Sequence, residues 1–428
     1  MDVAQSPTLS ERPPCRRLGF GAWVALLLAA VVILGLGALF AALSIIESPT
    51  YAWRVLAYQQ SDTNDWQIFP ERPIAAATVP SVLPVSIGGV PDTVAYPQAG
   101  GSKTERLADL LDRTGTKAFI VVRDDEVIYE AYPGSSREAV NTSFSTAKAV
   151  CSALIGAAIA DGLVGSVDDP VVRYLPEIAG RGLDALTIRD LLLMNTGVRY
   201  THADDQPFWM EPFGDDALTY YAADMRKLAL SVVAGSRPVG EAFYYNKYHP
   251  LLEGVILERV TRMPVAKYLE QRIWQPMGAE FPASWSLDSE ASGFEKMESG
   301  LNLRAIDFAR FGLIFLHDGY WNGQQIMPAA WVRQATAPLR PDPRTWEIFG
   351  SWKEQGGYYS YHWWGLNNAD GSYDYMARGQ YDQLIYIAPR KNIVIVRMGE
   401  QPDETVDWAF VSHAIVDAIE PSERESAT

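Results

Sequence analysis

The most informative run of residues is Phe144-Ser145-Thr146-Ala147-Lys148, which continues as AVCSALIGAAIADG to residue 162. Residues 146–161 are rich in alanine, isoleucine and leucine, and Gly162 is a typical C-terminal cap, so we expect a buried helix. Ser145 would stand in its first turn, where unpaired backbone N–H groups favour a developing alkoxide. Lys148 shares that helix face and could take the serine proton if burial lowers its pKa. A capping serine followed by a surface lysine is the alternative interpretation.

A second polar segment, Tyr244-Tyr245-Asn246, lies about a hundred residues further on and precedes an apolar helical run. A tyrosine near a lysine can share its proton and act as a base or as an acid toward a leaving group. An asparagine amide can hydrogen-bond the lysine or a substrate carbonyl. The other interpretation of this segment is an aromatic turn that serves packing alone.

The rest of the chain shows strand patterns near both ends and helical patterns between them. We therefore expect an α+β core with one helical insertion. A β-hairpin is expected at residues 118–122 and 127–132, and two further strands at 384–388 and 393–398. Helices are expected at 104–114, 186–194, 251–260, 305–316, 329–335 and 408–419.

The composition excludes several classes of protein. The 428 residues are 48% hydrophobic, which is enough for a large core, and the formal charge of −16 opposes binding to nucleic acid. With two cysteines, and with five histidines that show no metal-ligand spacing, we expect no metal site. The sequence also lacks a P-loop, a G-x-G-x-x-G loop, an EF-hand loop and a G-x-S-x-G elbow, so no cofactor is implied.

Residues 18–46 contain no charged side chain and would span about 43 Å as a helix, which exceeds the hydrocarbon core of about 30 Å. This length predicts one tilted transmembrane helix. A cleaved signal peptide is the alternative, but such apolar regions run to about 15 residues and no clear cleavage site follows. Arg12, Arg16 and Arg17 precede the helix, so the N-terminus is expected in the cytoplasm and the main domain in the periplasm or outside the cell.

These features divide the chain into five predicted parts. They are a cytoplasmic tail (1–17), a transmembrane anchor (18–46), a proline-rich extended strap (47–102), the main domain (103–420) and a polar tail (421–428). On this topology Cys15 and Cys151 lie on opposite sides of the membrane and cannot form a disulfide. Cys151 is then expected to be a small buried apolar residue.

Several blocks of sequence, taken in order, resemble the serine β-lactamase-related family. Within it the chain is most similar to the esterases and 6-aminohexanoate-dimer hydrolases near class C β-lactamases and D,D-peptidases. The resemblance covers roughly residues 63–419 and implies the β-lactamase/transpeptidase-like fold, an antiparallel sheet flanked by helices plus a helical subdomain. The blocks that carry it are Phe144–Lys148, Leu186–Val198, Tyr244–Asn246, Glu298–Asn302, Ala305–Gly312 and Ala377–Gly379.

The resemblance also implies a role for individual residues. Ser145 matches the nucleophile, Lys148 its general base, and Tyr244 the tyrosine of the Y-x-N motif, with Asn246 orienting the lysine or the substrate. The oxyanion hole would consist of the backbone N–H groups of Ser145 and Gln380, the second on an edge strand. The implied reaction proceeds through an acyl-enzyme and needs no metal or cofactor.

One block departs from the family pattern. Where β-lactamases and D,D-peptidases carry Lys-Thr-Gly to hold a substrate carboxylate, this chain has Ala377-Arg378-Gly379. Arg378 could replace the lost charge, but the direction of its side chain cannot be read from sequence because side chains alternate across a strand. Tyr200 and Trp364 are further candidates for the substrate cleft, together with Arg378 and Gly379.

We therefore predict a membrane-anchored serine hydrolase that cleaves a small-molecule ester or amide and has no nucleic-acid partner. The first alternative is a D,D-peptidase or β-lactamase that acts on cell-wall peptides or β-lactams. The second is a catalytically silent binding module that has kept the fold. The joint presence of Ser145, Lys148, Tyr244 and Asn246 argues against the silent module.

Overall fold

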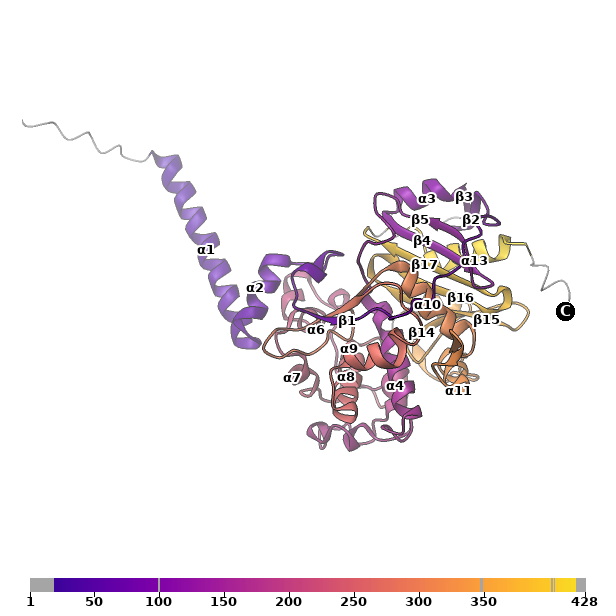
Figure 1. Cartoon of the computed structure of the whole chain (residues 1–428). Helices are drawn as coiled ribbons and strands as arrows, with labels where there is room; N and C mark the ends of the chain where they lie inside the picture. Colours follow the sequence, from indigo (N-terminus) through magenta and orange to yellow (C-terminus); the bar gives the residue numbers. More distant parts are fainter. Residues whose placement is uncertain (1–18, 99–100, 347–348, 402, 404, 421–428) are drawn as a thin grey trace, which may run out of the picture.

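The computed structural model describes residues 19–98, 101–346, 349–401, 403 and 405–420. Figure 1 shows a central sheet with helices on both faces, a mainly helical part beside it, and one long helix that projects from the domain. The predicted tails at 1–17 and 421–428, and Cys15 with them, lie outside the described residues. The architecture is α+β, as the sequence predicts.

The main sheet is antiparallel and has seven strands. Its spatial order is β13-β14-β15-β16-β17-β4-β5, so strands from the end of the chain pair with an early hairpin. The bounds are β4 (Thr116–Arg123), β5 (Glu126–Ala131), β13 (Gly357–Ser360), β14 (Trp363–Asn367), β15 (Tyr373–Gly379), β16 (Gln383–Ala388) and β17 (Ile393–Gly399).

Helices cover both faces of this sheet. Helix α10 (Ala305–Leu316) packs on one face together with the helical part, and α3 (Leu107–Arg113) and α13 (Trp408–Ala418) pack on the other. Alternate residues of β15 divide between the two cores, because Ala377 belongs to the first and Met376 to the second. The direction of each side chain of β15 is therefore set by its position in the strand.

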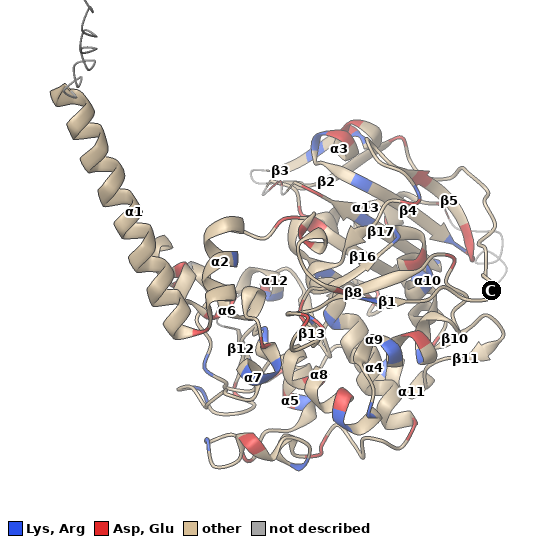
Figure 2. Cartoon of the chain, turned by 60° about the vertical axis from the view of Figure 1, so that its left-hand side comes forward, with Lys and Arg blue, Asp and Glu red and all other residues tan. Residues whose placement is uncertain are grey.

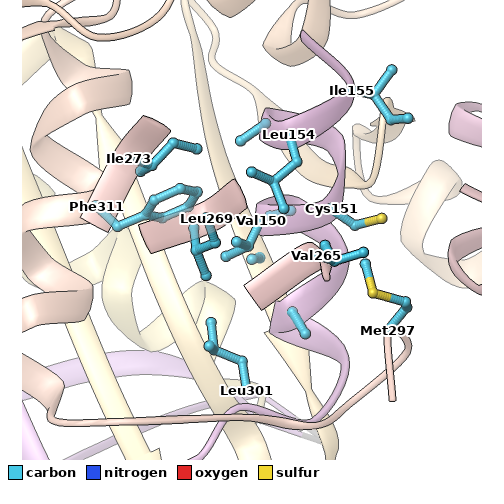
Figure 3. Close-up of a cluster of buried hydrophobic side chains, with 14 of the residues drawn as sticks. Val150, Cys151, Leu154, Ile155, Val265, Leu269, Ile273, Met297, Leu301 and Phe311 are labelled. Carbon is cyan, nitrogen blue, oxygen red and sulfur yellow. The ribbon is translucent and has the colours of Figure 1, made fainter. Parts of the chain in front are cut away.

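The helical part is built around a helix that is buried almost along its whole length. This helix, α4 (Ala147–Ala160), is followed by α5 (Ile188–Leu192), α6 (Asp215–Tyr221), α7 (Met225–Ala229), α8 (Tyr248–Thr261) and α9 (Val265–Leu269), with a π-helical turn at Glu270–Trp274. Figure 3 shows Val150 and Leu154 of α4 among Val265, Leu269 and Ile273. Cys151 is buried, and its thiol donates a hydrogen bond to Glu253 at 3.1 Å.

A small antiparallel sheet connects the two parts. Its order is β1-β8-β9-β6, and its strands are β1 (Glu71–Ile74), β6 (Asn141–Thr142), β8 (Ala283–Ser286) and β9 (Leu301–Leu303). Strand β6 leads directly into a 3-10 turn, η2 (Phe144–Thr146), and then into α4. This sheet therefore places the start of α4 beside the segment before β9.

The N-terminal segment contains the helices α1 and α2, which pack against each other. Helix α1 (Phe20–Ile46) is long and apolar enough to cross a membrane, and Figure 2 shows no charged residue along it. Helix α2 (Pro49–Tyr58) and η1 (Asp65–Gln67) follow, and then the hairpin of β2 (Thr93–Gln98) and β3 (Gly101–Arg106). The remaining elements are η3 (Val171–Arg173), η4 (Pro176–Ile178), η5 (Ala203–Asp205), η6 (Phe208–Phe213), β7 (Ala242–Phe243), β10 (Tyr320–Trp321), β11 (Gln324–Gln325), α11 (Ala329–Thr336), β12 (Thr345–Trp346), α12 (Gly350–Glu354), η8 (Gln380–Asp382) and η9 (Pro389–Lys391).

The predicted elements correspond closely to the observed ones in the main domain. The hairpin, the long helix at 146–161, the helix at 305–316 and the last two strands all form within a few residues of the expected bounds. The segment 47–102 differs from the extended strap that its prolines predict, because residues 49–58 form a helix whose Tyr51, Ala52 and Val55 are buried. Residues 101–106 form a strand where the helix at 104–114 was expected to begin.

Glycine lets α10 lie close to the main sheet. A Cβ atom on Gly312 would stand 2.7 Å from Val394 Cγ1 and 2.8 Å from Ile385 Cδ1. We expect Gly312→Val to lower the stability of the full chain by about 1–3 kcal/mol, because overpacking displaces α10 from β16 and β17. Gly350→Val in α12 is the control, because a Cβ there meets no atom of the described residues within 4 Å. Thermal unfolding in detergent checks this, and an equal loss for both variants would contradict the packing argument.

Candidate active site

Ser145 lies in η2, immediately before α4, and Lys148 stands in the first turn of that helix. The Lys148 Nζ atom donates to Ser145 Oγ at 2.8 Å and to the backbone oxygen of Glu298 at 2.8 Å. Phe144, just before the serine, has a φ of 43°, a left-handed conformation that side chains rarely adopt. Such strain is typical of functional sites, because the surrounding structure must stabilise it.

The environment of Lys148 favours the neutral amine. Its side chain is 1% exposed, and burial lowers the pKa to about 7, with the charge of Lys247 lowering it further and Glu298 opposing the shift. A neutral amine at hydrogen-bond distance from a serine hydroxyl can accept its proton. The pair therefore has both the geometry and the protonation state for nucleophilic catalysis.

The tyrosine beside this pair is Tyr245, not Tyr244 as the motif predicts. Lys148 Nζ lies 5.0 Å from the centroid of the Tyr245 ring, and the Tyr245 hydroxyl hydrogen-bonds Ser145. Burial raises the pKa of Tyr245 to about 12, so its phenol stays protonated at neutral pH. Tyr244 points elsewhere, because its hydroxyl donates to Asp205 at 2.9 Å.

Among the hydrogen bonds of the described residues, Asn246 makes none to Lys148. Its side chain accepts a hydrogen bond from the backbone N–H of Tyr248 at 2.8 Å, at the start of α8, and donates to the Val198 oxygen at 3.4 Å. These hydrogen bonds hold the start of α8, and the predicted role of Asn246 toward a substrate carbonyl stays a prediction. Counting from Tyr245, the third position of the motif is Lys247, whose Nζ lies 2.6 Å from Asp216 Oδ1.

The end of β15 lies against the nucleophile. A Cβ atom on Gly379 would stand 3.1 Å from the backbone nitrogen of Ser145 and 2.9 Å from the Ser143 oxygen. Gln380 follows directly, so its backbone N–H remains a candidate for the oxyanion hole, while its side chain accepts a hydrogen bond from Ser61 at 2.9 Å. Strand β15 is an inner strand of the sheet and not the edge strand that we expected.

Arg378 does not face Ser145, contrary to its predicted role in substrate binding. Its guanidinium lies 2.9 Å from Asp407, the residue before α13, and 4.9 Å from the centre of the Trp352 ring. Trp352 belongs to the core on the opposite face of the sheet from Ala377. Because side chains alternate along β15, the positions facing α4 are Ala377 and Gly379.

Two aromatic candidates stand behind the site. Trp364 stacks on the ring of Tyr245 with centroids 6.0 Å apart, so it supports the tyrosine from the rear. Tyr200 is 5% exposed and donates its hydroxyl to Asp216 at 2.7 Å. Each of them contacts a residue close to the catalytic pair, and neither contacts Ser145 in the described hydrogen bonds or ring pairs.

A segment between α5 and α7 is bound to the tyrosine-containing loop. Asp216 in α6 accepts hydrogen bonds from Tyr200 and from the Ala203 N–H and pairs with Lys247, and these partners hold its pKa far below the usual value. Its neighbour Asp215 accepts from the Tyr248 hydroxyl at 2.7 Å. We call residues 200–221 the lid segment because these carboxylates attach it to residues 247 and 248.

Sequence reasoning missed four contributors to this site. The side chains of Tyr245, Lys247 and Asp216 were not singled out, and Glu298 was named only as the start of a sequence block, without a role at the site. The distance in sequence from Tyr245 to the apolar run of α8 was the signal in the sequence that could have favoured Tyr245 over Tyr244. Among the described residues, no three histidine, cysteine or acidic side chains converge in a way that could hold a metal ion.

A serine at the start of a buried helix, with a lysine amine 2.8 Å from its hydroxyl, is the arrangement of an acyl-transferring serine hydrolase. The family model described as Beta-lactamase matches residues 105–419, and the chain belongs to that family. The 6-aminohexanoate-dimer hydrolase of Paenarthrobacter ureafaciens is 28% identical over 373 residues, which cover 82% of this chain and 92% of that enzyme.

Solved structures show the same fold. A putative 6-aminohexanoate-dimer hydrolase from Bacillus anthracis superimposes with a TM-score of 0.71 at 21% identity, covering 86% of this chain and 95% of that one. A class C beta-lactamase superimposes with a TM-score of 0.55 at 13% identity, covering 74% and 95% of the two chains. The β-lactamase/transpeptidase-like fold that the sequence implies is therefore confirmed.

The two adjacent tyrosines offer a direct test of the site. We expect Tyr245→Phe to lower kcat/KM by about 10²- to 10⁴-fold, because it removes the hydroxyl beside Ser145 and Lys148. Tyr244→Phe should cost less than about tenfold, since the Tyr244 hydroxyl donates to Asp205, whereas the Tyr245 hydroxyl hydrogen-bonds Ser145. Steady-state hydrolysis of a p-nitrophenyl ester compares the two variants. A larger loss for Tyr244→Phe would restore the motif-based assignment.

Proposed function

We propose that this serine hydrolase is anchored in a membrane and cleaves an ester or amide bond through Ser145, Lys148 and Tyr245. The observation that carries the proposal is the 2.8 Å contact between Lys148 Nζ and Ser145 Oγ, made by a lysine whose pKa is about 7. A lysine that is half neutral at physiological pH can act as the general base for serine.

Acylation begins when Lys148 takes the proton of Ser145 and Oγ attacks the substrate carbonyl. The oxyanion that forms is stabilised by the N–H groups of Ser145 and Gln380, and each such donor contributes about 3 kcal/mol in the transition state. Tyr245 donates its phenol proton to the leaving nitrogen or oxygen and regains one from the Lys148 ammonium. The bond to the leaving group breaks, and the acyl group stays on Ser145.

Deacylation uses the same groups in the opposite direction. Lys148, neutral again, accepts a proton from a water molecule directed at the acyl carbonyl, and the hydroxide attacks that carbon. Ser145 Oγ leaves and is reprotonated through Lys148 or Tyr245, which restores the starting state. The described residues supply every proton donor and acceptor that these steps need.

The main domain favours neutral acyl substrates over β-lactams. Strand β15 presents Ala377 and Gly379 toward α4, and the charge of Arg378 is paired with Asp407 on the other face. A carboxylate next to the scissile bond would therefore find no cation on the face of this strand that meets α4. The relative from Paenarthrobacter ureafaciens is a hydrolase of a 6-aminohexanoate dimer, which supports an amide among the substrates.

The N-terminal helix supports the anchoring. Helix α1 has 27 residues, a mean hydropathy of 2.8 in its most apolar window and no buried residue in that window. The arginines at 12, 16 and 17 precede it, so the catalytic domain would lie on the periplasmic or extracellular side.

The pH dependence follows from Lys148. Below its pKa the amine is an ammonium and cannot accept the serine proton, so kcat/KM should rise with pH and reach half its maximum near pH 7. Lys247→Met should move this midpoint to higher pH, because the Lys247 charge lowers the pKa of Lys148. Stopped-flow ester hydrolysis from pH 5 to 9 measures both profiles. A flat profile, or a midpoint that moves down in Lys247→Met, would contradict Lys148 as the base.

The reaction itself is tested with the full chain in detergent. We expect turnover of p-nitrophenyl butyrate or of the linear 6-aminohexanoate dimer, loss of that turnover in Ser145→Ala, and little cleavage of nitrocefin. Ser152→Ala is the matched control, because it lies on the same helix and its hydroxyl has no hydrogen-bond partner within the described part of the chain.

Three outcomes separate the alternatives in that experiment. Rapid nitrocefin cleavage would favour a β-lactamase or D,D-peptidase. A mass adduct of a fluorophosphonate on wild type but not on Ser145→Ala would identify the nucleophile. Absence of turnover and of any adduct in the wild type would favour the silent binding module.

A further inference from the structure

The last turns of α1 are packed into the catalytic domain. Leu43 is fully buried in a small hydrophobic core with Tyr51 and Val55 of α2, Phe69 and Tyr221, and Leu39 and Phe40 pack against this core. No residue from Phe20 to Ala38 is buried. These 19 residues span about 28 Å as a helix, which matches the hydrocarbon core of about 30 Å. The bilayer surface would therefore meet the protein where this core begins.

The lid segment is hydrogen-bonded to α2, whose Tyr51 and Val55 belong to the small core around Leu43. The Tyr51 hydroxyl donates to the Pro212 oxygen in η6 at 2.6 Å, and Arg54 donates to the Tyr221 oxygen at 3.1 Å. The backbone N–H of Ala223 donates to Glu47, one residue past α1. Figure 1 shows α2 beside the end of α1 and α6 next to it. The lid segment is thus held at the end of the domain that α1 enters.

An exposed apolar patch stands on the same segment. Phe208 is 75% exposed, Trp209 is 63% exposed, and Met210 is also exposed; we call these three residues the η6 tip. The tip precedes Pro212 by two to four residues, and the Phe208 and Trp209 rings contact each other edge to face. Trp53 on α2 is 61% exposed as well. Aromatic residues of this kind gather at the interface between lipid and water.

We propose that the η6 tip is a bilayer-binding surface through which the enzyme takes amphiphilic esters or amides directly from the membrane. This inference rests on the proposed function. The lid segment joins the tip to the catalytic loop, because Asp205 accepts from Tyr244 and Asp216 pairs with Lys247, two residues from Tyr245. The lid segment thus connects the η6 tip to the loop that carries Tyr245, and we assign this segment as the route of an acyl chain from the bilayer surface.

The position of the tip is tested in vesicles with the full chain. Trp209→Cys is made in a Cys15→Ser background, where the remaining Cys151 is buried, and labelled with a bimane. We expect quenching by phosphatidylcholine that carries a nitroxide near the headgroup end of its acyl chain. Tyr320→Cys on β10 is the control, because it is exposed and Figure 2 shows β10 on the opposite side of the domain from α1. Equal quenching at both positions, or none at 209, would overturn the proposal.

The substrate class is tested by chain length. The double variant Phe208→Ser, Trp209→Ser should lose about tenfold or more in turnover of p-nitrophenyl palmitate dissolved in vesicles, since it removes two interfacial anchors. Its turnover of water-soluble p-nitrophenyl butyrate should stay within about twofold of wild type. An equal loss on both esters would overturn the membrane route. Failure of the wild type on butyrate would instead count against the proposed function, and the quenching result would still decide where the tip lies.

Discussion

The site depends on one buried hydrogen bond, from Lys148 Nζ to the backbone oxygen of Glu298. That bond fixes the amine beside Ser145, while burial removes the water that would stabilise an ammonium. Both effects require α4 to be enclosed, and the helical part and the main sheet enclose it. The two packed parts of the fold therefore produce the basicity on which the chemistry depends.

The site forms where the main sheet meets the helical part, and Gly379 allows β15 to approach the start of α4 closely. Gly379 at the end of β15 leaves no room for a Cβ beside Ser143 and Ser145, which brings the backbone of β15 to the nucleophile. On the opposite face Arg378 pairs with Asp407 before α13. Strand β15 therefore contacts the second core through the Arg378 side chain and the candidate active site through the backbone of Gly379. An inner strand of the sheet can contact the site in this way because its last residue is a glycine.

Much of the fold could be predicted because its signals are strong. The apolar run of α4 and the alternating residues of the two strands before α13 predict the same elements that the structure shows. The spacing of three residues between Ser145 and Lys148 predicts that the two side chains lie close together. The tyrosine could not be placed, since Tyr244 and Tyr245 are adjacent and only the backbone decides which one faces Lys148. The predicted substrate-binding role of Arg378 was wrong for a related reason, because successive side chains of a strand point to opposite faces of the sheet. The contacts of Asp216 join distant segments, and no local pattern encodes them.

The burial of Leu43 imposes two structural constraints on the end of α1. In the proposed anchoring, residues 39–46 follow the membrane span and also pack against the core that holds Tyr51 and Tyr221. Proteolytic cleavage after Leu43 would remove this side chain from the core and leave a cavity among Tyr51, Val55 and Tyr221. A shed form of the enzyme would consequently be a different catalyst from the attached one. Its activity would report whether the cut fell before or after that leucine.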